Sequence, residues 1–159
     1  MAVTLRKARV TDLPSIYLGE QDYIRTWEPA HALAWQNDLH RHLTRWVEHF
    51  ERLTVALLDE QFAGYSLWAP TEGQAELCTI NVSPAYRRCG IGRALLERYG
   101  ADAAQANCTR LVLSVRADNP ARLMYEQAGF ACTGTDCHGY LRYETVTESL
   151  QNVPRKVTM

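Results

Sequence analysis

Residues 87–92 read Arg-Arg-Cys-Gly-Ile-Gly, between a strand-like run at 75–82 and an amphipathic stretch that begins near residue 93. A strand, a glycine loop and a helix in this order offer a diphosphate several backbone N–H groups and the positive end of a helix. Gly90 and Gly92 lack a Cβ, so a ligand can approach the backbone closely. Phosphate oxygens can also accept hydrogen bonds from three arginines, namely Arg87, Arg88 and Arg93. The segment predicts a phosphate-binding loop, although a glycine pair alone also occurs in ordinary helix-capping turns.

Two common nucleotide-binding motifs are excluded. The chain has no Gly-x-x-x-x-Gly-Lys-Ser/Thr sequence, which the phosphate loop of ATPases requires. Leu95 stands where a dinucleotide-binding Gly-x-Gly-x-x-Gly pattern needs its third glycine.

A second block, Asn119–Phe130, reads Asn-Pro-Ala-Arg-Leu-Met-Tyr-Glu-Gln-Ala-Gly-Phe. In this order and spacing, the loop and the second block resemble the GCN5-related N-acetyltransferase superfamily. The resemblance implies acetyl-coenzyme A (acetyl-CoA) as the acyl donor. Residues 113–119, Leu-Ser-Val-Arg-Ala-Asp-Asn, further resemble ribosomal-protein alanine N-acetyltransferases, and Glu20-Gln21…Trp27 resembles their N-terminal segment.

This subgroup resemblance has two departures. Ser114 stands where those enzymes have a glutamate, and the long helix expected around Trp35 and Trp46 differs from their short second helix.

The resemblance assigns a set of residues to coenzyme binding. The diphosphate would be held by the whole loop, whose residues are Arg87, Arg88, Cys89, Gly90, Ile91, Gly92 and Arg93. The strand 79–82 would leave its parallel neighbour at a bulge, so that backbone groups of Ile80 and Val82 hold the pantetheine arm and the acetyl carbonyl. Asn119 matches an asparagine that contacts the coenzyme, or it serves only as the N-cap of the next helix.

Acyl transfer to an amine requires a neutral amine and a protonated leaving thiolate. A lysine amine has a pKa near 10.4, so its neutral form costs roughly 4.6 kcal/mol at pH 7, whereas a peptide α-amine costs about 1.4 kcal/mol. A positioned base is therefore needed most for lysine acceptors. The resemblance suggests Tyr125 as the acid and Glu76 as the base. Reserve candidates for the base lie in flexible segments and are Asp22, Glu28 and Glu72.

Composition limits the location and the partners. The 159 residues carry a net charge of −1, with 47% apolar and 22% charged residues, so a nucleic-acid or membrane-surface role has no global electrostatic support. We see no N-terminal targeting segment and expect a cytoplasmic protein. Five scattered cysteines suggest reduced thiols and no metal site, and they stand at positions 78, 89, 108, 132 and 137. A homodimer is left open.

Periodicity predicts an α/β (α+β) fold with a mixed sheet of six to seven strands and about four helices. Strands are expected at 3–9, 53–58, 62–69, 75–82, 110–115, 130–135 and 140–147. The family resemblance implies the GNAT fold, in which the sheet splays at the strands before and after the coenzyme-loop helix. Helices are expected at 12–18, 30–52, 92–106 and from Pro120 to Gly129. We predict a single domain over 1–150 and a loose tail over 151–159.

The sequence thus predicts an acetyl-CoA-dependent N-acetyltransferase that transfers directly to a primary amine in a ternary complex. The acceptor is left open between a small-molecule amine and a protein N-terminus or lysine. Acidic residues at 20, 22, 28 and 72 suit a cationic acceptor. The alternative from another class is a non-catalytic CoA-binding sensor or interaction domain.

Overall fold

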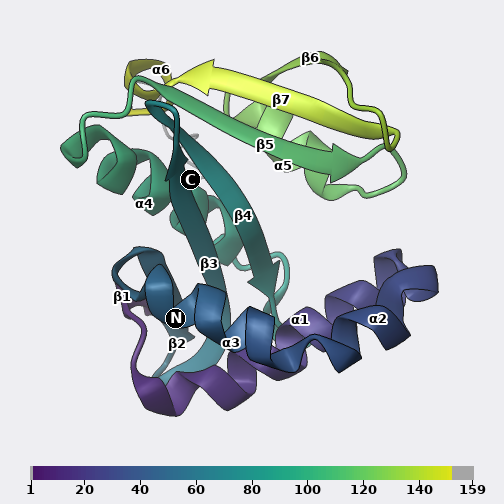
Figure 1. Cartoon of the computed structure of the whole chain (residues 1–159). Coiled ribbons are helices and arrows are strands. Elements are labelled where there is room, and N and C mark those ends of the chain that lie inside the picture. The colour runs from purple at the N-terminus through teal and green to yellow at the C-terminus, as the bar shows by residue number, and fades with distance from the viewer. Residues whose placement is uncertain (1, 152–159) are drawn as a thin grey trace. The chain divides into compact units, whose positions relative to one another are not determined.

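The structure is a computed structural model, which describes residues 2–151. These residues form two compact units. The first unit comprises residues 2–69 and 78–96, and the second comprises 70–77 and 97–151. The described strands form a seven-stranded mixed sheet in the order β1-β2-β3-β4-β5-β7-β6, with β4 contributing to both units (Figure 1).

The first unit is built on antiparallel strands. β1 (Val3–Lys7) pairs with β2 (Leu53–Leu58), which pairs in turn with β3 (Gln61–Thr71). Residue 63 is left out of the β2–β3 register, which shifts between Ala56 and Leu57. β2 itself alternates regularly between two apolar clusters, with Val55 in one cluster and Ala56 in the other.

Helix α1 (Leu13–Trp27) follows a 3₁₀ turn, Val10–Asp12, and is longer than predicted. The sequence suggested a helix that ends near Leu18 and a less regular segment after it. The helix instead continues, and Gly19 lies against the strands. A Cβ at Gly19 would stand 2.7 Å from Cε1 of Tyr65, so the glycine permits the close approach of α1 to β3.

The single long helix predicted over 30–52 is wrong. The structure has a 3₁₀ turn (Pro29–His31), α2 (Ala32–Asn37), α3 (Leu39–Glu48) and a second 3₁₀ turn (Phe50–Arg52). The break lies at Asp38, whose φ of −100° and ψ of 26° are not helical. Asparagine and aspartate are poor helix formers because their side chains compete for the backbone. Tyr17, Trp35 and His42 then stack across the three helices, with ring centroids 5.2 and 4.6 Å apart.

β4 (Gln74–Val82) is the strand that both units share. In the second unit its first residues pair in parallel with β5 (Arg110–Arg116), and the paired stretch ends at Glu76 and Val112 although both strands continue. In the first unit, Cys78 packs on the cluster with α1 and α3, and the hydroxyl of Thr79 lies beside Glu20 of α1. Two consecutive residues on one side break the strand's alternation, which indicates an irregularity in β4 at this point.

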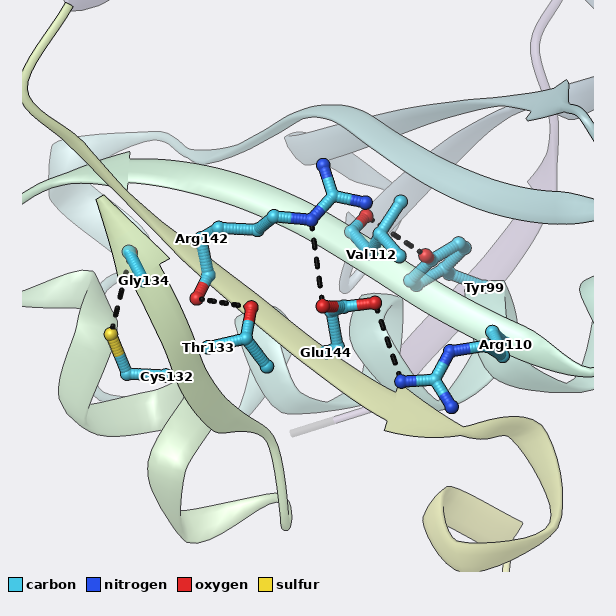
Figure 2. Close-up of polar contacts among 8 residues, drawn as sticks. All are labelled: Tyr99, Arg110, Val112, Cys132, Thr133, Gly134, Arg142 and Glu144. Carbon is cyan, nitrogen blue, oxygen red and sulfur yellow. Dashed lines mark hydrogen bonds and ion pairs between the residues drawn. The ribbon is translucent and has the colours of Figure 1, made fainter. Parts of the chain in front are cut away.

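The second unit contains the strands that follow the loop helix. β5 pairs with β7 (Tyr140–Val146), which pairs with β6 (Ala131–Thr135), and α5 (Ala121–Gln127) connects β5 to β6. On β7, the Glu144 carboxylate lies between Arg110 and Arg142, at 3.3 and 3.5 Å (Figure 2). The hydroxyl of Thr133, followed by these two guanidinium groups, lowers the pKa of Glu144.

α4 (Ile91–Gln105) starts at the glycine loop, and its C-terminal part lies in the second unit. There the buried Tyr99 hydroxyl donates to the carbonyl oxygen of Ala75 at 2.5 Å, which fixes α4 to the paired part of β4. α6 (Thr147–Gln151) ends the described chain.

The predicted mixed sheet is confirmed. The described residues hold six α-helices rather than about four, because the long helix is divided and α6 is added. The single domain over 1–150 stays a prediction. The predicted tail over 151–159 lies, except for Gln151, outside the described residues.

Candidate active site

The loop has a backbone shape suited to binding an anion. Arg88 and Gly90 both have left-handed φ values, 65° and 79°, and α4 begins directly afterwards at Ile91. The helix's first hydrogen bond runs from Ala94 N–H to Gly90 O at 3.1 Å, so the N–H groups of Ile91 and Gly92 have no acceptor within the helix. Left-handed turns followed by a helix N-terminus direct several N–H groups toward one point. Binding of a diphosphate at this loop stays a prediction.

The glycine at position 90 is required by conformation rather than by crowding. A Cβ built on Gly90 would meet no atom within 4 Å, and only the positive φ disfavours a side chain. The space beside it is therefore open on the protein's side. Arg93 lies in the first turn of α4 and is half-buried.

The loop is attached to the end of β4 within the first unit. The Arg87 Nε donates to the carbonyl oxygen of Val82 at 3.3 Å. Ile80, Val82 and Cys89 pack on one apolar cluster, whose buried members are Ala56, Leu58, Ala63, Ile91 and Leu95. Because the side chain of Ile91 belongs to this cluster, only its backbone can face a ligand. The structure thus places the predicted loop residues beside Ile80 and Val82.

Asn119 and Tyr125 lie in the second unit, close together in sequence. Asn119 is buried, and its Oδ1 accepts a hydrogen bond from the N–H of Ala121, the first residue of α5, at 2.9 Å. It therefore fills the capping role that the sequence offered as one of two alternatives. Tyr125 is also buried and packs edge-on against Phe130, with ring centroids 6.1 Å apart.

Carboxylates predicted as bases are mostly exposed. Glu76 is exposed on β4, opposite Val112 of β5. Of the reserve candidates, Asp22 is exposed on α1, and Glu72 is exposed in the β3–β4 turn with a φ of 50°. Glu28 is half-buried at the C-terminal end of α1.

Glu20 is a buried carboxyl that sequence reasoning did not single out for the site. Its Oε1 is buried and accepts no hydrogen bond from any described residue. Burial raises the pKa of Glu20 to about 7, although the hydroxyls of Thr79 and Tyr65 and the charge of Arg45 act in the opposite direction. The sequence did contain a signal, because Glu20 follows the fully buried Ile16 by four positions and so shares its inward face.

No metal-binding group of three or more histidine, cysteine or acidic side chains occurs among residues 2–151. The cysteines in this part of the chain are free thiols. None of the described helices combines the length and apolarity that crossing a membrane would require.

Comparison with known proteins gives the family. Residues 16–130 match the model of the acetyltransferase (GNAT) family. The ribosomal protein bS18-alanine N-acetyltransferase of Escherichia coli K12 is 32% identical over 130 residues, which are 80% of each chain. The corresponding protein of Salmonella typhimurium is 31% identical over 134 residues, again 80% of each chain.

Solved structures show the same fold. Ribosomal-protein-alanine N-acetyltransferase from Brucella melitensis has a TM-score of 0.74 at 23% identity, with 90% of this chain and 99% of that chain covered. PaiA N-acetyltransferase from Thermoplasma acidophilum, solved with coenzyme A, has a TM-score of 0.73 at 19% identity, with 92% and 99% covered. The relatives named above are N-acetyltransferases, and N-acetyltransferases are acyltransferases. Together with the glycine loop and the mixed sheet, these matches show that the chain belongs to the acetyltransferase (GNAT) family.

Proposed function

We propose that this protein transfers an acetyl group directly from acetyl-CoA to a primary amine while both substrates are bound. The observation that carries the proposal is the loop at residues 87–92, whose left-handed backbone precedes the N-terminus of α4. The loop would bind the coenzyme diphosphate through its N–H groups. Arg88 and Arg93 would add charge-assisted contacts.

The first candidate for the acceptor is the α-amine of a protein N-terminus. Relatives that are 31–32% identical are named for the N-terminal acetylation of a ribosomal protein's alanine, which supports this choice. An α-amine needs only about 1.4 kcal/mol to become neutral at pH 7, so a base of moderate strength is sufficient. A small-molecule amine and a lysine side chain are the other candidates.

Two residues in the second unit have proposed roles in the chemistry. The Tyr125 phenol would protonate the leaving thiolate, because a phenol remains protonated at neutral pH. A carboxylate would accept the proton of the amine, and Glu76 is the candidate for it that the sequence supplies. Asn119 would contact the coenzyme, as the family resemblance implies for an asparagine at this place.

The test uses acetyl-CoA with a panel of acceptors, and it measures both free CoA and acetylated product. The panel pairs a peptide that begins with alanine with the same peptide acetylated at its N-terminus. A third peptide carries one lysine and a blocked N-terminus, and a set of small amines completes the panel. We expect product only from free α-amines. Tight acetyl-CoA binding without product from any acceptor would instead favour a non-catalytic CoA-binding domain.

A cytoplasmic location and a homodimer are also proposals. Cell fractionation tests the first, and light scattering of the purified protein tests the second.

A further inference from the structure

Glu20 reaches from α1 toward β3 and β4 inside the first unit. The helix is held there by Asn81, whose Nδ2 donates to the carbonyl oxygen of Gly19 at 3.1 Å and lies 3.4 Å from the Tyr65 hydroxyl oxygen. The missing side chain at Gly19 allows this contact, since a Cβ there would lie 2.8 Å from the Tyr65 hydroxyl oxygen. The position of Glu20 is therefore fixed by its immediate neighbour in the chain.

The surroundings of Glu20 are polar, but Oε1 of its carboxylate accepts no hydrogen bond from them. The groups that face it are the hydroxyls of Tyr65 and Thr79 and the charge of Arg45, one from each of β3, β4 and α3. On α1 itself, Asp22 acts on Tyr65 and disfavours loss of the phenol proton. Arg45 is exposed and donates to the Cys78 sulfur at 3.1 Å, so its charge is partly screened by water.

Oε1 of Glu20 is buried without a hydrogen-bond partner among the described residues, and such an oxygen is costly when the carboxyl is ionised, so it calls for an explanation. With a pKa of about 7, Glu20 is present in both protonation states near neutral pH. This is the property required of a group that takes up a proton and releases it in each cycle.

The neighbours of Glu20 on β4 connect it to the proposed acyl site. Thr79 directly precedes Ile80, and the backbone of Ile80 and Val82 is proposed to hold the pantetheine arm and the acetyl carbonyl. These residues and the phosphate-binding loop all belong to the first unit. The Glu20 side chain as a whole is only half-buried, so an acceptor amine can approach it.

We propose that Glu20 is the catalytic proton acceptor for the acceptor amine, with Glu76 as the rival carboxylate. The role rests on the proposed function. Glu20 takes one proton from the ammonium, and the nitrogen lone pair then attacks the thioester carbon. As the C–N bond forms, the C–S bond breaks and the thiolate takes the Tyr125 proton. The second nitrogen proton returns to the Tyr125 oxygen, and Glu20 releases its proton to water.

The test compares Glu20→Gln with Glu76→Gln, the variant of the rival carboxylate, using the peptide that begins with alanine. We expect Glu20→Gln to lower kcat/KM at pH 7 by a factor on the order of 10²–10⁴ and to recover as the pH approaches the pKa of the amine. Its affinity for acetyl-CoA, measured by calorimetry, should be unchanged. Glu60→Gln, which changes an exposed carboxylate in the turn between β2 and β3, is the control and should keep the wild-type pH profile. Glu20→Asp, which retains a shorter carboxyl, should restore part of the rate.

Several outcomes would overturn this role. They are a wild-type pH profile for Glu20→Gln, loss of coenzyme affinity together with activity, or loss of the acidic limb in Glu76→Gln alone. These results leave the proposed function intact, because the wild-type protein would still form product. A wild-type protein that acetylates no acceptor would overturn the proposed function, and with it the role of Glu20.

Discussion

The buried carboxyl of Glu20 should make the stability of the protein depend on pH in a direction unusual for a glutamate. Its ordinary pKa is 4.5 and its folded pKa is about 7, so between these values the folded state binds more protons than the unfolded state. The free energy of unfolding should therefore fall as the pH rises through this window. At about 1.4 kcal/mol per pH unit, a pKa difference of about 2.5 (7 minus 4.5) corresponds to roughly 3 kcal/mol.

Urea denaturation of the wild-type protein and Glu20→Gln at pH 5, 6, 7 and 8 measures this contribution. Glutamine cannot ionise, so the variant should gain stability over the wild type by up to roughly 3 kcal/mol between pH 5 and pH 8. Other titrating groups contribute equally to both proteins and cancel in the difference. Glu76→Gln, at an exposed position, is the control and should show no comparable gain. A difference between wild type and Glu20→Gln that stays constant with pH would refute the reasoning.

Three further predictions concern the loop, the acid and the second unit. Gly92→Asp and Gly90→Val should abolish acetyl-CoA binding in a folded protein. The first places a negative charge at the diphosphate site, and the second strains the backbone at a φ of 79°. An unchanged affinity in calorimetry would contradict this prediction. Tyr125→Phe should lower kcat by about 10²–10⁴ with coenzyme affinity retained, and steady-state kinetics with an unimpaired kcat would exclude the acid role. Tyr99→Phe should lower the free energy of unfolding by about 1–3 kcal/mol, because the carbonyl oxygen of Ala75 loses a buried donor; equal urea midpoints for variant and wild type would disprove it.

The strands and the loop were predictable from sequence because their signals are local. Alternation and β-branched content predicted β2, β5 and β7 closely, and Gly129, with a φ of 98°, marks the end of α5 as its position suggested. Two coordinated blocks of sequence were sufficient to identify the family. These features depend on neighbouring residues, which a sequence displays directly.

The wrong or missing predictions concern residues whose structural role depends on tertiary packing. The segment after Leu18 was expected to be irregular, but Gly19 is an interior residue of α1 that lies against Tyr65. The break at Asp38 was missed because the helix was extended back to residue 30, although its apolar period begins only at Leu39. Glu20 was counted only as a negative charge on the acceptor side, because its burial depends on β3 and β4, more than forty residues further along the chain.

The division of β4 between the two units has a consequence for how the chain can be made and cut. The polypeptide passes from one unit to the other three times, at 69/70, 77/78 and 96/97. During synthesis from the N-terminus, the first unit cannot be completed until residues 78–96 have emerged, after a segment of the second unit is already made. A fragment that starts at residue 97 would lack the β4 residues that pair with Arg110–Val112 of β5. It would expose an unpaired strand edge and should aggregate, so neither unit can be obtained intact as one continuous fragment.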